Sequence, residues 1–537
     1  MLSYLIRQSR LLLIAASIAS VVSAICGVLM ISRINTALTA DNHTPVLMWS
    51  FFGLIVLLML GRILSSALFE RLAQHSMAEL RRYISGKILT AELRQLELIG
   101  SARLHSALSE HCASVVQFFV TLPSLLNHSV VVVGCMIYML LLSWKIFLAA
   151  IVMIGLGSLG HFIAQSKATA FLRRSSMEQD RLFGYFRALT DGAKELRLNE
   201  SKRRVFRDDL LGKSIETVRK NRTAGASLFM ISSRWGNFLI YAFIGLVLFV
   251  LSENISNREQ VMTGFALVFF FMMGPLEGLL GAIPRAKVSG VAADRIDDII
   301  RELEAAAVPV QGIRRESFTS IRLKNVLHRY YHEQSNELFQ LGPVNLEFRP
   351  GTVTFLVGGN GSGKTTLAKL VTGLYAPESG AIFVDDTPID DADRDGYRQL
   401  FSAVFSDFHL FERLMEVGCP ELDETGNALI SKLQLQHKVT MRHGAFSTQS
   451  LSQGQRKRLA LVVAHLEDRP FLVFDEWAAD QDPTFKDVFY RELLPELKSA
   501  GKTVLVISHD DRYFHLGDRI LKLEHGRLLA AEVPEPS

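Results

Sequence analysis

Residues 11–32 form an apolar run without a charged side chain, bracketed by Arg10 and Arg33. A helix needs about 20 mostly apolar residues to cross the hydrocarbon core of a bilayer. Lipid offers no hydrogen-bond partners, so a crossing segment must satisfy its own backbone groups, as a helix does. A secretory signal peptide has a shorter apolar core and a small-residue cleavage site. The sequence therefore predicts a retained membrane-spanning helix here.

Further apolar segments follow, and together they predict six spans, at roughly 11–34, 46–69, 121–144, 146–165, 226–251 and 260–283. The whole chain has 537 residues, of which 49% are hydrophobic and 21% are charged. That composition excludes a disordered or collagen-like chain, and the length requires several domains. We predict a transmembrane domain over 1–284, a linker over 285–315 and a soluble domain over 316–537.

Basic residues are concentrated in two long segments, 70–120 and 166–225, while the connector 34–45 has no Lys or Arg. Cytoplasmic segments carry the excess of basic residues in membrane proteins. We therefore place both long segments, both termini and the soluble domain in the cytoplasm. The mixed apolar and charged periodicity of these segments predicts long cytoplasmic helix extensions. The net charge of +4 is explained by this pattern, so no nucleic-acid partner is expected.

Three charged residues, Arg62, Arg234 and Glu277, fall inside predicted spans. Charges at membrane depth are costly and usually face a cavity or a partner. They indicate either a polar path for a transported molecule or side chains that reach the membrane surface. The four cysteines are widely spaced and show no metal-ligand spacing, which favours packing roles in a reducing compartment.

A glycine-rich motif in the soluble half follows the strand-like stretch VTFLV and precedes a helix-like stretch. Strand, glycine-rich loop and helix in this order is the context of a P-loop, whose backbone N–H groups surround phosphate oxygens. Lys364 is expected to reach the β- and γ-phosphates of ATP, and the Thr365 hydroxyl to contact Mg²⁺. The candidate nucleotide-binding residues are Gly358, Gly359, Asn360, Gly361, Ser362, Gly363, Lys364, Thr365 and Thr366.

Two more buried-strand patterns end in polar residues. Phe471-Leu-Val-Phe precedes Asp475 and Glu476, and Thr503-Val-Leu-Val-Ile-Ser precedes His509. An acid at the end of such a strand is expected to hold Mg²⁺, which assigns that role to Asp475. Glu476 is placed to act as the general base on the attacking water. We expect His509 to contact the γ-phosphate.

The segment Leu451-Ser-Gln-Gly-Gln455, which precedes the helix-like RKRLALVVAHL, resembles the signature motif of ATP-binding-cassette (ABC) proteins, with Gln453 where Gly is commoner. Six spans with cytoplasmic extensions followed by one P-loop α/β cassette resemble an ABC exporter half-transporter. The resemblance implies a dimer in which Ser452, Gly454 and Gln455 of one cassette close over ATP on the other. It also implies that Tyr330, with Tyr331 as the alternative, stacks on adenine. Residues 90–105 and Lys194–Asn199 resemble elements that couple the membrane domain to the cassettes.

Another position departs from the general family pattern. Ser406 stands where the family has a Gln that contacts metal and water, and the neighbouring Asp407 is the alternative contact. The wording around the motifs, such as Asp475-Glu-Trp-Ala-Ala-Asp-Gln-Asp-Pro483, resembles the bacterial exporters of cyclic peptides and siderophores, including the microcin and pyoverdine exporters.

The sequence thus predicts a homodimeric ATPase of the bacterial inner membrane that exports a peptide-derived molecule or a siderophore precursor by alternating access. Its expected cofactors are ATP and Mg²⁺. Its expected partners are a second copy of the chain, membrane lipid and the small cargo, with a periplasmic or outer-membrane export protein left open. Two alternatives remain: a lipid or drug exporter with the same ATPase, and a regulatory membrane ATPase without cargo.

Overall fold

The computed structural model describes residues 10–39, 44–249, 258–304, 315–332, 337–415 and 420–529. The chain divides into two compact units. The membrane unit consists of Met1–Ser85 and His105–Asp298, and the cassette unit of Gly86–Leu104 and Ile299–Ser537. Part of the predicted linker, residues 305–314, lies outside the described residues. The domain limits at 284 and 315 stay predictions.

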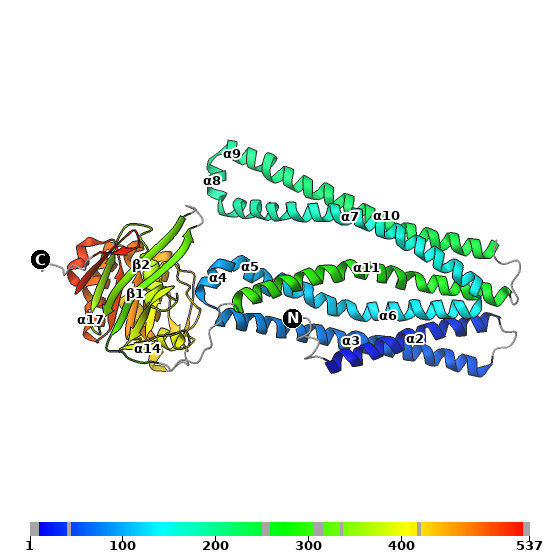
Figure 1. The fold of residues 1–537 in the computed structure, drawn as a ribbon, viewed down its shortest axis with the longest axis horizontal. Helices are drawn as coiled ribbons and strands as arrows, with labels where there is room; N and C mark the ends of the chain where they lie inside the picture. Colours follow the sequence, from blue (N-terminus) through cyan, green and yellow to red (C-terminus); the bar gives the residue numbers. More distant parts are fainter. Residues whose placement is uncertain are drawn as a thin grey trace. The chain divides into compact units, whose positions relative to one another are not determined.

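Long helices make up the membrane unit (Figure 1). They are α2 (Arg10–Thr39), α3 (Pro45–Thr90), α6 (Cys112–Leu142), α7 (Trp144–Asp191), α10 (Lys213–Phe249) and α11 (Arg258–Glu304), of which α3 and α11 end in the cassette unit. Short helices and π-helical turns connect them: α5 (Ser101–Ser106), Ala107–His111, α8 (Ala193–Leu198), α9 (Glu200–Val205) and Phe206–Gly212. Helices α3 and α7 run on far beyond the apolar stretches, as the predicted extensions require.

Five helical stretches of the described residues are long and apolar enough to cross a membrane: Arg10–Thr39, Pro45–Thr90, Arg103–Leu142, Trp144–Asp191 and Gln260–Ala282. The remaining predicted span, 226–251, lies in α10 and is not among them, and its last two residues lie outside the described residues. This stretch contains Ser232, Ser233 and Arg234, which lower its apolarity.

Apolar side chains and cross-helix hydrogen bonds hold the membrane unit together. Helices α2 and α6 lie side by side, as do α7 and α10 (Figure 1). The rings of Phe243 and Phe269 pack at 4.8 Å between α10 and α11. Buried Asn35 of α2 donates to the Tyr138 hydroxyl at 3.0 Å and accepts from Thr263 at 2.8 Å. Such polar bonds join helices where surrounding lipid removes the hydrophobic driving force between them.

The cassette contains two main sheets. An antiparallel sheet has the order β2-β1-β4-β5, from Glu337–Phe348, Ile321–His332, Ser379–Val384 and Thr387–Pro388. A six-stranded sheet has the order β12-β11-β3-β10-β9-β6, from Arg527–Leu528, Arg519–Glu524, Val353–Val357, Thr503–Ile507, Phe471–Asp475 and Phe401–Val404. A small hairpin, β7 (Met441–Arg442) and β8 (Ala445–Phe446), stands apart from both.

The six-stranded sheet is buried on both faces, which explains the continuous apolar strands. Successive side chains of a strand point to opposite faces. Accordingly, Leu472 packs into one core and Val473 into the other. The first core contains side chains of the helices α14 (Pro420–Lys432), α15 (Gln453–Leu466) and α17 (Leu494–Ser499), and the second lies against the antiparallel sheet and α12 (Lys364–Val371). The short helices α13 (Arg394–Arg398) and α16 (Pro483–Asp487) complete the cassette.

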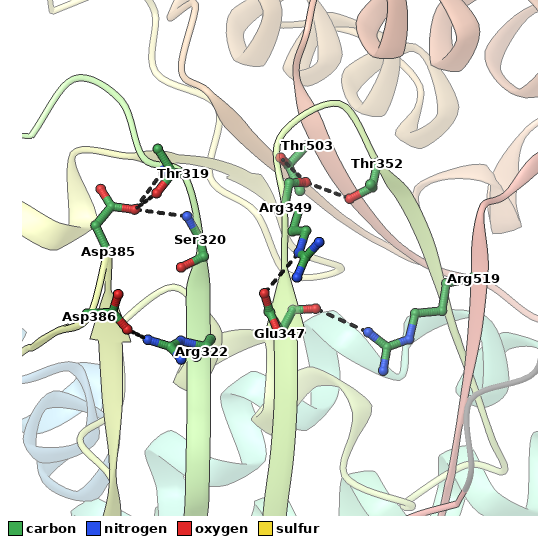
Figure 2. Close-up of polar contacts among 10 residues, drawn as sticks. All are labelled: Thr319, Ser320, Arg322, Glu347, Arg349, Thr352, Asp385, Asp386, Thr503 and Arg519. Atoms are coloured by element: carbon green, nitrogen blue, oxygen red, sulfur yellow. Dashed lines mark hydrogen bonds and ion pairs between the residues drawn. The ribbon is translucent and has the colours of Figure 1, made fainter.

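Polar contacts join the two sheets (Figure 2). Arg519 of β11 donates to the carbonyl oxygen of Glu347 at the end of β2, at 3.1 Å. The Thr503 hydroxyl, at the start of β10, donates to the carbonyl oxygen of Arg349 at 3.1 Å. Asp385 accepts hydrogen bonds from Thr319 just before β1 begins. The Asp385 contact lies within the antiparallel sheet, and the Arg519 and Thr503 contacts fix this sheet relative to the strands that carry the site.

Candidate functional site: the nucleotide edge of the cassette

The predicted site residues follow three neighbouring parallel strands. In the register, Ile507 of β10 lies opposite Leu356 of β3 and opposite Asp475 of β9. Because parallel strands present their carboxyl ends at one edge, the segments that follow them emerge together. The structure therefore places the glycine-rich loop, the Asp475–Glu476 pair and His509 at one edge of the sheet, as predicted.

Backbone geometry explains the glycines of the loop. Gly361 and Gly363 have φ angles of 75° and 102°, in the left-handed region that favours glycine. A Cβ atom on Gly358 would lie 2.2 Å from the carbonyl oxygen of Leu523, so no larger residue fits there. Helix α12 begins at Lys364, directly after the loop. The loop thus brings backbone N–H groups and a helix N-terminus to one point, which suits phosphate binding.

Two side chains in the loop fit a phosphate ligand. The Ser362 hydroxyl is buried and has no hydrogen-bond partner among the described residues. The Lys364 ammonium is buried and donates to the carbonyl oxygens of Gly358 and Gly359 at 3.0 Å each. An unpaired buried hydroxyl costs free energy, and a phosphate oxygen would satisfy it. The residues present therefore fit the phosphates of ATP.

Asp475 and Thr365 lie together beside the loop. The Thr365 hydroxyl donates to the carboxylate of Asp475 at 2.8 Å. Burial raises the pKa of Asp475, and the hydrogen bond from Thr365 opposes that rise. A hydroxyl and a carboxylate are the oxygen ligands that Mg²⁺ uses with phosphates. The negative charge of Asp407 acts on Asp475, whereas Ser406 is exposed and has no such contact within the described residues.

Glu476 and His509 face each other at the same edge. The Nε2 atom of His509 lies 3.4 Å from a carboxylate oxygen of Glu476. Both line a cavity of about 280 Å³ together with Ser508, Lys486 and Asp510. Glu476 has a φ angle of 52°, an uncommon conformation for a non-glycine residue. Uncommon backbone conformations are concentrated at functional sites.

The signature segment is anchored to the chain that follows Glu476. Ser452 caps α15 and forms a reciprocal capping box with Gln455. The Gly454 carbonyl oxygen accepts from Gln481 at 3.0 Å. Lys457, of which only 4% of the side chain is exposed, pairs with Asp480 at 2.7 Å and donates to the Glu476 carbonyl oxygen at 3.0 Å. The backbone of the general-base candidate is therefore tied to the signature helix by a buried ion pair and hydrogen bonds.

Within the part of the chain that the structure describes, no hydrogen bond or ion pair joins residues 358–366 to residues 452–455. The structure does not bring these two sets of predicted nucleotide ligands together in one chain. Tyr330 lies in β1 opposite Phe339, and its stacking on adenine stays a prediction.

Helix α4 (Leu93–Ile99) and the residue before it lie against the cassette. Glu92 pairs with Arg394 at 2.8 Å, and Arg94 pairs with Glu378 at 3.2 Å. Glu97 pairs with Lys369 of α12 at 2.7 Å, and the Tyr375 hydroxyl also donates to it. Burial and the bond to Glu97 raise the pKa of Tyr375 to about 12. Because Lys369 lies on the helix that begins at the glycine-rich loop, α4 has a short path to the nucleotide edge.

Comparisons with known proteins identify the class. The model of the ABC transporter transmembrane region matches residues 10–276, and that of the ABC transporter ATP-binding domain matches residues 341–479. The ATP-binding protein SyrD of Pseudomonas syringae pv. syringae is 35% identical over 96% of this chain and 93% of its own length. The chain therefore belongs to the ABC transporter family, and it has the organisation of an exporter half-transporter with an ATPase cassette.

More distant relatives agree with this fold. The ATP-dependent lipid A-core flippase of Cupriavidus metallidurans is 25% identical over 90% of this chain and 83% of its own length. The lipid A-core flippase of Vibrio cholerae is 24% identical over 96% of this chain and 91% of its own length. A solved bacterial Atm1-family ABC exporter with ATP bound superimposes with a TM-score of 0.74 at 14% identity, covering 98% of this chain and 95% of that one. The predicted exporter fold is confirmed.

Lys457 and the charged partners of α4 are site residues that the motifs in the sequence did not indicate. A signal for Lys457 was available: it lies one turn before Leu461 and two turns before Ala464, both buried positions of α15. A lysine on the buried face of a helix needs a fixed acidic partner. No comparable signal marked Arg394, because its partner Glu92 lies far away in the sequence.

Proposed function

We propose that two copies of the chain form an ATP-driven exporter of a peptide-derived molecule or a siderophore precursor in the bacterial inner membrane. The observation that carries this proposal is the pairing of Glu476 with His509 beside the glycine-rich loop, in a chain similar to an exporter along its whole length. Its resemblance to cyclic-peptide and siderophore exporters supports the cargo class.

In this proposal, each nucleotide site is completed by the other copy. Lys364, Ser362 and the loop N–H groups bind the phosphates on one side. Ser452 and Gly454 of the partner subunit close the other side, which agrees with the absence of contact between these segments in one described chain. Thr365 and Asp475 would hold Mg²⁺, which supplies positive charge to the phosphates.

Glu476 polarises the attacking water, and His509 orients Glu476 and contacts the γ-phosphate. Glu476 is suited to this role because Lys457 anchors its backbone carbonyl oxygen and its side chain lines the cavity. ATP binding then favours the closed dimer, and hydrolysis releases it. Moving such an equilibrium from 1:99 to 99:1 requires about 5.5 kcal/mol of differential binding.

The docking of α4 supports coupling to the membrane helices. Closure of the cassettes would act on Glu92, Arg94 and Glu97, which lie directly after α3 in the chain. Helix α3 continues into the membrane unit, so a displacement of α4 acts on a spanning helix. The stretch Lys194–Asn199, largely in α8, is proposed as a second coupling element.

The test is ATP hydrolysis and transport by the full chain in proteoliposomes, screened against secreted peptides and siderophore precursors of the host. Stimulation by one such compound, together with ATP-dependent uptake into inverted vesicles, is the expected result. Glu476→Gln should bind ATP and lower turnover by about 10²–10⁴-fold. Normal steady-state hydrolysis by this variant would overturn the assignment of the base.

A lipid or drug exporter is the second candidate, favoured by the two lipid A-core flippases among the relatives. It predicts stimulation by lipids alone and movement of labelled lipid between leaflets. A regulatory ATPase without cargo predicts stimulation only by a protein partner. The same reconstituted system separates all three.

A further inference from the structure

Helices α2, α3 and α6 of the membrane unit enclose a cavity of about 320 Å³. Its polar lining includes Ser20 and Ser23 of α2, Arg62 and Ser65 of α3, and Asn127 and His128 of α6. Pockets for small molecules begin at about 300 Å³. The cavity therefore has room for one or two residues of a peptide-type molecule, but not for a whole cyclic peptide.

Three serine hydroxyls of the cavity are already used between helices. Ser20 donates to the carbonyl oxygen of Pro123 at 3.0 Å, and Ser23 donates to that of Leu58 at 3.1 Å. Ser65 donates to the carbonyl oxygen of Ala16 at 3.2 Å. These bonds hold the walls together and leave the serines few donors for a ligand.

Arg62 and His128 are two further polar groups of the cavity, and both have unused polar atoms. Arg62 has no hydrogen-bond or ion-pair partner among the residues that the structure describes, although it lies on a membrane-spanning helix. The Nδ1 atom of His128 is buried, and it too has no partner in the described part of the chain. An unpaired arginine at membrane depth is costly and marks a ligand or ion pathway. Both groups line the same cavity.

The cavity also contains a negative charge at its other end. Glu70 lies two turns along α3 from Arg62, which places the two backbone positions about 12 Å apart at 1.5 Å per residue. Glu70 accepts a hydrogen bond from Gln74 at 2.9 Å. The anionic group of a bound molecule is therefore attracted to Arg62 and repelled from Glu70. These two charges favour one orientation of the molecule in the cavity.

We propose that this cavity binds an anionic group of the exported molecule, a peptide carboxylate, through Arg62 and His128. The inference rests on the proposed export function and deepens it by assigning a cargo subsite within one chain. A guanidinium donates two parallel hydrogen bonds to a carboxylate, and a histidine donor completes the set.

The test uses the full chain in phosphatidylcholine nanodiscs and two probes, N-dodecanoyl-Gly-Glu amide and N-dodecanoyl-Gly-Gln amide, each labelled with the same uncharged fluorophore at the end of the acyl chain. The probes differ only in one carboxylate, so their binding ratio measures recognition of that group. We expect the unmodified chain to bind the Glu probe at least tenfold more tightly. Arg62→Gln should abolish the preference, and Arg62→Lys should restore part of it, which separates lost charge from lost folding.

Arg71→Gln is the matched control, because Arg71 is an exposed arginine on α3 that does not line the cavity. It should retain the preference. Equal binding of both probes by the unmodified chain would overturn the proposal, as would an unchanged preference in Arg62→Gln. Competition by phosphatidylglycerol that Arg62→Gln removes would support the anion site and assign it to a lipid phosphate.

Transport is measured separately with both probes in proteoliposomes. A carboxylate preference in binding without ATP-dependent uptake of any screened compound would contradict the export function while leaving the anion site standing. ATP-dependent uptake without a carboxylate preference in binding would support the export function and contradict the anion site.

Discussion

The cassette site and the membrane cavity hold their ionisable side chains in different ways. In the cassette, Asp475 and Lys364 stand beside buried strand ends and already have protein partners, Thr365 and two loop carbonyls. In the membrane unit, Arg62 and the Nδ1 atom of His128 lie along helix faces and have no partner among the described residues. A preformed set of contacts suits a ligand that is the same in every cycle. Polar groups without a protein partner suit a cargo that must be both bound and released.

Among the groups that already have protein partners, the largest effect is expected where the cassette is most preorganised, at Lys364. Lys364→Ala removes the charge aimed at the phosphates and the bonds to Gly358 and Gly359. Removing one preorganised donor from such a site costs about 10²–10³ in turnover. Steady-state ATPase of the reconstituted chain measures the loss. Lys432→Ala, which breaks a surface pair with Glu496, is the control and should change little.

The anchoring of Glu476 by Lys457 gives the next prediction. Lys457→Met removes the cation that pairs with Asp480 and the ammonium that donates to the Glu476 carbonyl oxygen. Among the described residues, Asp480 then keeps only the neutral bond from Gln453, and the carbonyl oxygen keeps the bond from the Ala479 N–H. We expect the free energy of unfolding of the cassette to fall by about 1–3 kcal/mol, the cost of losing a charged hydrogen bond. Because Asp480 is partly exposed, the loss should lie near the lower end of this range. This appears as a drop of several degrees in the melting temperature of the cassette, with slower ATP hydrolysis.

Lys432→Met serves again as the surface control for that experiment. Equal melting shifts for the two lysine variants would show that the buried pair is no more important than an exposed one. That result would contradict the view that the Lys457–Asp480 pair makes the nucleotide edge more rigid than the membrane cavity.

The same contrast explains what the sequence could predict. The glycine-rich loop, Asp475, Glu476 and His509 each follow a buried strand directly, and parallel strands bring their ends together without further information. The cavity depends on the rotation of α2, α3 and α6 about their axes, which a uniformly apolar helix does not reveal. Arg62 was therefore visible as a charge in a span, but its neighbours were not. Long-range pairs such as Glu92 with Arg394 were equally hidden.

A smaller effect on activity is expected when a contact between α4 and the rest of the cassette is removed. Helix α4 follows the spanning helix α3 in the chain, so this contact bears on coupling. Arg394→Gln removes the pair with Glu92, in which 8% of the arginine side chain is exposed. We expect ATP hydrolysis to continue while transport per ATP falls by about tenfold, since a charged hydrogen bond contributes about 1.5–3 kcal/mol. Transport and hydrolysis measured in the same vesicles give this ratio. Arg349→Gln, at an exposed pair with Glu347, should leave it unchanged.

The smallest effect concerns Glu378, which accepts hydrogen bonds from Arg94 and Arg329. Burial favours the neutral acid, but these two bonds outweigh it and lower the pKa of Glu378. A lowered carboxyl pKa stabilises the docked state above the ordinary value near 4.5, and the stabilisation is lost as the pH falls through the lower, folded value. Because the pair is partly exposed, its contribution is below about 1 kcal/mol.

Hydrogen exchange of the α4 amides, corrected for intrinsic rates, measures this loss between pH 6 and pH 3. We expect the opening of α4 to increase by less than about fivefold in the unmodified chain, as a surface pair of that strength allows. Glu378→Gln has no carboxylate to protonate, so its exchange should not change with pH through this pair. Acid-induced opening of the same size in both chains would show that protonation of Glu378 does not weaken the docking of α4. The bonds from Arg94 and Arg329 would then contribute nothing measurable, unlike the partnered groups of the nucleotide edge.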